Sequence, residues 1–199
     1  MSRLARALLL AAVAVCLAAP SASAASSGSL LGDLWTTLLE TPTAENPFVT
    51  GDPACVDLDR ETVAPFTPAP SLPDPTCIVK RGTTIFVAAS TWECSTFPED
   101  HFDYGTTEAQ LRRCARQNDA QVAPAVTVDR QPVRVTAVET RLLRIHLPRD
   151  NIFGQAGADR RGGSVAHGWV VLLKGLARGT HTIKIVSAGN SITTRIIVK

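Results

Sequence analysis

Apolar and polar residues alternate along much of the C-terminal half of the chain, with the two-residue period of a half-buried β-strand. Within residues 140–148, three aliphatic side chains fall on one face, and the other face carries Arg144 and His146. Residues 165–176 are apolar on both faces, which predicts a central strand. Further β-branched and apolar runs occupy residues 83–89, 180–186 and 191–198.

Turn-forming residues separate these strand segments. Asp129-Arg130 lies between two short β-branched runs, residues 126–128 and 133–135, and predicts a hairpin. Ser187-Ala188-Gly189-Asn190 predicts a second hairpin between the last two strands. Six or more strands with few helices predict a mainly β fold, and we expect an antiparallel β-sandwich of the jelly-roll or immunoglobulin-like kind.

Helical spacing of apolar residues occurs in two places. Residues 30–39 carry leucines at helical intervals, which predicts a short N-terminal helix with Ser29 as its cap. Its apolar stripe is expected to pack in the core. Two threonines before Glu108 predict the start of one internal helix, which runs to about Gln117.

The first 24 residues match the pattern of a secretory signal peptide. Two arginines open the segment, an uninterrupted apolar run fills residues 8–19, and alanines stand at positions 22 and 24. We therefore expect residues 1–24 to be removed and the protein to be secreted. Residues 25–29 are then expected to form a mobile tail, and residues 30–199 a single β-sandwich domain. No second apolar run is long enough to form a transmembrane segment.

Four of the five cysteines follow the predicted leader, and an even number in an oxidising compartment implies two disulfides. Three pairings are possible. We favour Cys55–Cys77 and Cys94–Cys114, because both close short loops. The first of these bridges would hold a Pro-rich, loop-forming segment, residues 41–76, against the domain.

Charge changes sign along the predicted mature chain. Residues 25–110 contain 13 acidic and 3 basic side chains, whereas residues 111–199 contain 5 acidic and 15 basic ones. The halves cancel, and a net charge of zero argues against nucleic acid as the main partner. One interpretation is a basic face for an acidic partner. The other, which we favour, is that the two halves pack together and neutralise each other.

Three histidines lie on predicted strands, namely His146, His167 and His181. Imidazoles on neighbouring strands bind a metal only if they point the same way. The alternation places His146 with Arg144 and His181 with Ile183, so the three rings are not expected to converge. We therefore expect neither a metal nor another cofactor.

Two carboxylates at strand exits, Glu93 and Asp150, are candidates for acid–base catalysis together with His181. Each residue also has a structural interpretation, since Asp150 begins a turn and Glu93 can pair with an arginine. The chain has no Gly-x-Ser-x-Gly nucleophile motif. These residues define one hypothesis, a small extracellular hydrolase.

The second hypothesis, which we favour, is a secreted non-catalytic protein that binds a cell-envelope glycan or a protein. Trp92 follows a strand and is a candidate stacking platform. Asn151 and His167 are the other candidate binding residues. Glu93, Asp150 and a histidine meeting in one cleft would favour the enzyme, whereas an exposed Trp92 with no converging polar cluster would favour binding.

An ordered series of short segments from residue 35 to the C-terminus resembles a family of secreted bacterial proteins of uncharacterised activity. The resemblance implies an exported, disulfide-bonded β domain and no known reaction. The chain departs from the family in residues 56–70, which lack an aromatic, glycine-containing strand, and at His167-Gly168-Trp169-Val170, which replaces Asp-Gly-Tyr-Trp. The segments are Trp35-Thr36-Thr37-Leu38-Leu39, Pro42, Asn46-Pro47, Thr50-Gly51, Cys55, Cys77, Gly82, Glu93-Cys94-Ser95, Thr107-Glu108-Ala109-Gln110-Leu111, Cys114, Leu147-Pro148-Arg149-Asp150-Asn151-Ile152-Phe153-Gly154, Gly168-Trp169-Val170-Val171-Leu172-Leu173-Lys174 and Gly179-Thr180-His181-Thr182-Ile183.

Overall fold

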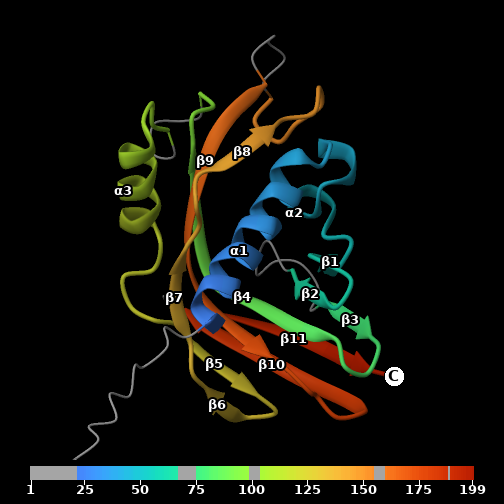
Figure 1. The fold of residues 1–199 in the computed structure, drawn as a ribbon. Coiled ribbons are helices and arrows are strands. Elements are labelled where there is room, and N and C mark those ends of the chain that lie inside the picture. Colours follow the sequence, from blue (N-terminus) through green and yellow to red (C-terminus); the bar gives the residue numbers. More distant parts are fainter. Residues whose placement is uncertain (1–21, 67–74, 99–103, 155–159, 188) are drawn as a thin grey trace, which may run out of the picture.

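Two β-sheets pack face to face, and helices lie against both faces of the first sheet (Figure 1). The computed structural model describes residues 22–66, 75–98, 104–154, 160–187 and 189–199. The first sheet contains β1 (Cys55–Asp57), β2 (Thr62–Pro65), β4 (Thr84–Ser95), β9 (Arg161–Leu173) and β7 (Thr136–Glu139) in this order, and β8 (Leu143–His146) also pairs with β9. The second sheet contains β3 (Thr76–Val79), β11 (Asn190–Val198), β10 (Gly179–Ser187), β5 (Ala125–Val128) and β6 (Gln131–Val133) in this order.

Aliphatic side chains fill the space between the two sheets. Ile85 and Val87 of β4 meet Ile183 of β10 and Ile196 of β11, and all four are buried. The predicted mainly β sandwich is therefore confirmed. Burial of this apolar surface is the main stabilising contribution to such a fold.

Both sheets are mixed, not purely antiparallel as the sequence predicted. Strand β2 runs parallel to β4, and β3 runs parallel to β11. The reason is the path of the chain, since β3 lies between β2 and β4 in sequence but belongs to the other sheet. Crossing to the second sheet and returning lets β2 and β4 lie parallel, which a tight hairpin does not allow.

Helix α1 (Ala22–Glu40) covers the face of the first sheet that points away from the second (Figure 1). Leu31, Leu34 and Leu38 are buried there against Phe86 of β4. The apolar stripe of this helix thus packs in the core, as expected. A 3-10 turn (Thr43–Glu45) and the one-turn helix α2 (Pro47–Thr50) follow.

The predicted mobile tail, residues 25–29, is instead part of α1. The physical reason is a close contact with the first sheet. A Cβ atom placed on Gly28 would lie 2.9 Å from the carbonyl oxygen of Glu139, so only glycine allows the helix to approach this strand. Most of the predicted leader, residues 1–21, lies outside the described residues. Within the described residues, no helix is long and apolar enough to cross a membrane.

Helix α3 (Glu108–Asn118) lies on the opposite side of the first sheet from α1 (Figure 1). Its N-terminus is a capping box, in which Thr107 accepts from the backbone of Gln110 and the Gln110 side chain accepts in return. Leu111 and Ala115 are buried on its inner face. The predicted internal helix is confirmed to within about one residue at its C-terminus.

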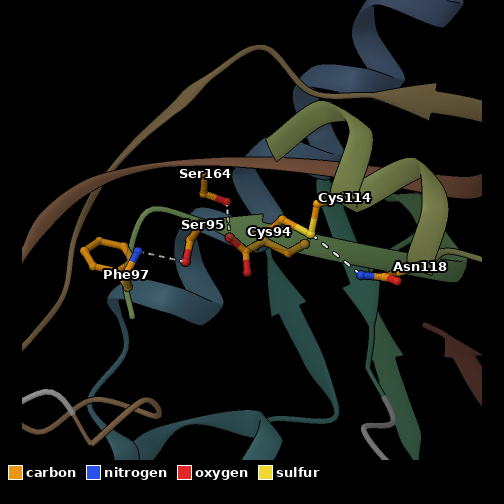
Figure 2. Close-up of a disulfide and its surroundings, with 7 residues drawn as sticks. Cys94, Ser95, Phe97, Cys114, Asn118 and Ser164 are labelled. Carbon is orange, nitrogen blue, oxygen red and sulfur yellow. Dashed lines mark hydrogen bonds between the residues drawn. A yellow bond between two sulfur atoms is a disulfide. The ribbon is translucent and has the colours of Figure 1, made fainter. Parts of the chain in front are cut away.

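The favoured disulfide pairing is present in the structure, as Cys55–Cys77 and Cys94–Cys114. Cys55 lies on β1 and Cys77 on β3, so the first bridge joins the two sheets. The second bridge joins β4 to α3, and Asn118 donates to Cys114 Sγ beside it (Figure 2). One bridge therefore links the two sheets at their edge, and the other links α3 to the first sheet.

Candidate binding surface beside Trp92

An irregularity in β4 determines which residues face α3. The pairing of β4 with β9 shifts between Ala88 and Ser90, which is a β-bulge. Before the bulge, odd-numbered residues such as Val87 face the second sheet. After it, the even-numbered Cys94 and Trp92 face α3, which lies on the same side of the first sheet. The bulge therefore turns Trp92 toward the junction between α3 and the second sheet.

Trp92 lies directly opposite His167 of β9. Trp92 is 40% exposed, which is unusually large for a tryptophan in a strand. Residues that face each other across antiparallel strands have Cβ atoms about 5 Å apart, so the two rings are neighbours. Two of the three predicted binding residues are thus adjacent in the structure.

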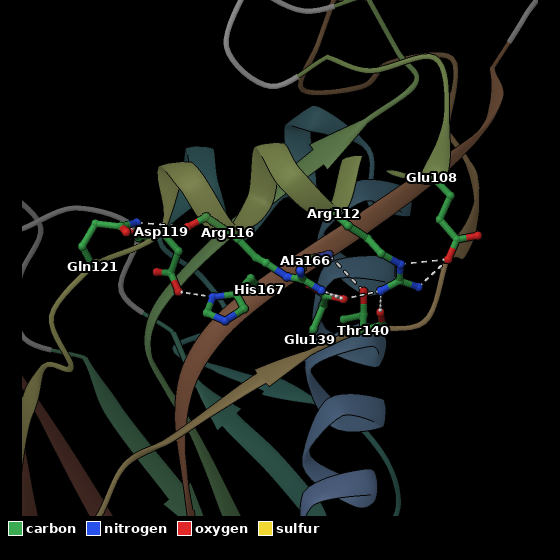
Figure 3. Close-up of polar contacts among 9 residues, drawn as sticks. All are labelled: Glu108, Arg112, Arg116, Asp119, Gln121, Glu139, Thr140, Ala166 and His167. Atoms are coloured by element: carbon green, nitrogen blue, oxygen red, sulfur yellow. Dashed lines mark hydrogen bonds and ion pairs between the residues drawn. The ribbon is translucent and has the colours of Figure 1, made fainter. Parts of the chain in front are cut away.

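A buried carboxylate fixes the orientation of His167. Nδ1 of His167 lies 2.8 Å from Oδ2 of Asp119, and the Asp119 side chain is only 1% exposed (Figure 3). Because a carboxylate only accepts hydrogen bonds, Nδ1 carries the hydrogen. Asp119 Oδ1 accepts from Ser90 Oγ at 2.7 Å and from the Ala120 backbone at 2.7 Å. The Asp119 carboxylate is therefore fully hydrogen-bonded.

The turn that carries Asp119 is held in place by its neighbours. The backbone N–H of Asp119 donates to the Ala115 carbonyl and ends α3. The Gln121 side chain donates to three carbonyls at this end of the helix. Trp169 of β9 donates from its ring nitrogen to the carbonyl of Ala120 at 2.8 Å. These contacts fix the turn to the sheet, and so position Asp119.

An ion-pair cluster lies on the other side of His167 from Trp92. Glu139 of β7 pairs with His167 in the strand register and accepts from Arg112 and Arg116 of α3 (Figure 3). Burial raises the pKa of Glu139, but the hydrogen bonds from Arg116 and Arg112 outweigh it, so the pKa lies below its usual value. The hydrogen bond that Arg112 donates to Glu108 raises the pKa of Arg112. The charges of Glu108, Arg112, Arg116 and Glu139 are therefore already paired with one another.

The other predicted residues lie elsewhere. Asn151 is buried and structural, since its side chain donates to the Pro148 carbonyl and accepts from the Phe153 backbone. Such bonds are typical of an asparagine that stabilises a turn. Asn151 is therefore not part of the surface around Trp92.

The three candidate catalytic residues do not share a site. Glu93 is buried in the first sheet, where it accepts from Ser164. Asp150 lies in the exposed turn after β8. His181 belongs to β10 of the second sheet and pairs with Asp129. Within the described part of the chain, no three histidine, cysteine, aspartate or glutamate side chains lie close enough together to hold a metal ion.

Asp119, Ser90 and Glu139 organise the surface around His167, and none of them was predicted from the sequence. Their partners are remote, since Asp119 is 48 residues from His167 and 29 from Ser90. The only local signal is the position of Asp119 at the end of the predicted helix.

Comparisons with protein-family models, with curated proteins and with solved structures find no match to this chain.

Proposed function

We propose that this protein is a secreted, non-catalytic binding protein that recognises a glycan of the cell envelope or its surroundings through the surface around Trp92 and His167. The observation that carries the proposal is the 40% exposure of Trp92 in the middle of a strand, directly beside an oriented histidine. Exposed aromatic rings are platforms on which the apolar face of a sugar ring packs, while adjacent polar groups bind its hydroxyls.

The polar neighbours suit this role because they are held rigidly. Asp119 fixes Nδ1 of His167, so the other ring nitrogen is left to meet a ligand hydroxyl. A preorganised site binds with a smaller loss of side-chain entropy. The two disulfides are compatible with an oxidising, extracellular compartment.

The proposal is tested by a thermal-shift screen of the protein against neutral polysaccharides. A ligand at 100 times its dissociation constant stabilises the folded state by about 2.7 kcal/mol, which raises the melting temperature measurably. The Trp92→Ala variant should lose this response. Tyr104→Ala, which removes another exposed aromatic ring, should retain it. No response to any neutral polysaccharide, or equal loss in both variants, would contradict the proposal.

The Asp119–His167 pair also supports a second candidate function, a hydrolase. A histidine whose Nδ1 is bound to a buried carboxylate is arranged to accept a proton at Nε2. Ser90 is not arranged as its nucleophile, because its hydroxyl donates to Asp119. The histidine would therefore activate water.

A panel of chromogenic glycosides, esters and peptides distinguishes the two functions. Turnover that disappears in His167→Gln and is unchanged in His146→Gln would establish the hydrolase. Binding of a glycan without turnover supports the binding protein.

A further inference from the structure

A second surface lies on the ribbon formed by β8 and β9, far along β9 from Trp169. On β8, Leu143 and Ile145 point into the core and are buried. Arg144 and His146 alternate with them and are exposed on the other face. Arg161 of β9 lies directly opposite His146 in the strand register. We call Arg144, His146 and Arg161 the basic face.

The three side chains of the basic face are close together. His146 and Arg161 are a directly opposed pair, whose Cβ atoms lie about 5 Å apart in such a register. Arg144 is two residues from His146 on the same strand, a separation of about 7 Å. Arg144 and Arg161 are therefore diagonal neighbours on one face of the ribbon, so a single anionic ligand can reach both guanidinium groups.

In the part of the chain that the structure describes, no acidic side chain forms an ion pair with the basic face, and the ion pairs there involve Arg112, Arg116, His167 and His181 instead. The carboxylate of Glu40 lies beside this strand and accepts from the backbone N–H of His146 at 2.8 Å, without an ion pair to the side chains of the basic face. Among the described residues, Arg144 and Arg161 thus contribute positive charge that no ion pair offsets.

The basic face borders a shallow hollow of about 490 Å³. Gly162 and Gly163 form part of its lining, opposite Ile145 and Arg144 in the strand register. Gly163 has no side chain, and the side chain of Leu142 packs over it beside Arg144. The hollow is large enough for one or two sugar residues, given that small-molecule sites span about 300 to 1,000 Å³.

We propose that the basic face binds an anionic polysaccharide whose carboxylate or sulfate groups pair with Arg144 and Arg161. A guanidinium group binds such oxyanions through two parallel hydrogen bonds. The site lies apart from the surface around Trp92, so the inference goes beyond the proposed function and does not depend on it.

The chemistry of the face favours a polysaccharide over a membrane. Leu142 is the exposed large apolar side chain in the hollow, and it packs on Gly163, since a Cβ atom placed on that glycine would lie 3.1 Å from Leu142 Cδ1. Membrane-surface binding requires a broad apolar face that inserts between headgroups. An extended polymer, in contrast, needs only a row of charges and a shallow hollow.

The test measures the affinity of the full chain for dextran sulfate and polygalacturonate at physiological salt, with neutral dextran, anionic phospholipid vesicles and duplex DNA in parallel. The variant Arg144→Gln/Arg161→Gln should weaken polysaccharide affinity about tenfold or more, because two charge-assisted contacts are lost. The control Arg178→Gln/Arg195→Gln removes the same charge from β11 and from the loop before β10, and should change affinity less than about twofold. Circular dichroism checks that both variants are folded.

The proposal is overturned if neither anionic polysaccharide binds, or if both double variants weaken binding equally, which would show a nonspecific charge effect. Tighter binding to the vesicles or to DNA would also overturn it. Trp92→Ala provides a separate readout, since it should leave dextran sulfate binding intact even if it abolishes neutral glycan binding.

Discussion

A carboxylate that leaves water must replace its hydration with hydrogen bonds, and Asp119 does so completely. It accepts from Ser90 and the Ala120 backbone and orients the ring of His167. The residue thus links α3, β4 and β9 at one point. Its position was not predictable, because the bulge in β4 and the packing of α3 bring together groups that are remote in the sequence.

Asp119→Ala tests this role. The change leaves Ser90 and His167 without their shared partner in a mostly buried place, which should lower the free energy of unfolding by about 1–3 kcal/mol. Asp57→Ala removes an exposed carboxylate of β1 and should cost less. Urea denaturation measures both. A loss for Asp119→Ala no larger than for Asp57→Ala would contradict the structural role of Asp119.

His181 has acceptors at both ring nitrogens. Nδ1 lies 2.7 Å from Asp129 and Nε2 lies 2.9 Å from the Ala177 carbonyl, so both bonds form only when the ring is protonated. The bond to Asp129, and then that to Ala177, raises the pKa of His181. The hydrogen bond from His181 in turn lowers the pKa of Asp129.

These shifts predict the sign of a pH dependence. A histidine with a raised folded-state pKa stabilises the protein below its ordinary pKa of 6.5, and this contribution is lost as pH rises through the raised value. The Asp129 contribution is present above 3.8 and is lost as pH falls through the lowered value. From about pH 5.5 to 8.5, the wild type should therefore lose more stability than His181→Gln. Equal losses in chemical denaturation would contradict this.

Among the secondary-structure elements, those stabilised by residues close in the sequence were predicted correctly. The capping box of α3 and the hairpin at Asp129-Arg130 are encoded by neighbouring residues, and both are present. Both turn residues have positive φ, of 50° and 69°, as a tight hairpin turn requires. The parallel pairs β2–β4 and β3–β11 were missed, because strand partners depend on packing of the whole chain.

The bridge between β4 and α3 tests how much this helix depends on its link to the sheet. The double variant Cys94→Ser/Cys114→Ser should lower the free energy of unfolding by about 3 kcal/mol, because the unfolded chain regains the freedom of the closed loop. Hydrogen exchange should increase most in α3. A stability within about 0.5 kcal/mol of the wild type would contradict a stabilising role.

At the scale of the molecule, the fold positions both surfaces on the first sheet. The second sheet and α3 occupy the same face of β4 and β9, and Trp92 lies at the junction between them. The basic face lies at the far end of β9. The sequence predicted the sandwich and identified Trp92 as a candidate binding residue, but the relation between Trp92 and His167 required the strand register.

Secretion remains a prediction that rests on the first 24 residues. Expression of the full chain in an exporting bacterial host should give a protein outside the cytoplasm that begins at Ala25 and contains no free thiol. N-terminal sequencing and thiol titration measure both. Retention of the uncleaved chain in the cytoplasm would contradict the prediction.

Quenching of tryptophan emission by acrylamide, with and without a neutral polysaccharide that gives a thermal shift, tests most directly whether a sugar packs on Trp92. Trp92 is the exposed tryptophan, whereas Trp35 and Trp169 are half-buried and donate ring hydrogen bonds to Thr91 and Ala120. A sugar stacked on Trp92 should protect the quenchable emission in the wild type and have no effect in Trp92→Phe. Unchanged quenching of the wild type at saturating polysaccharide would show that Trp92 does not carry the binding.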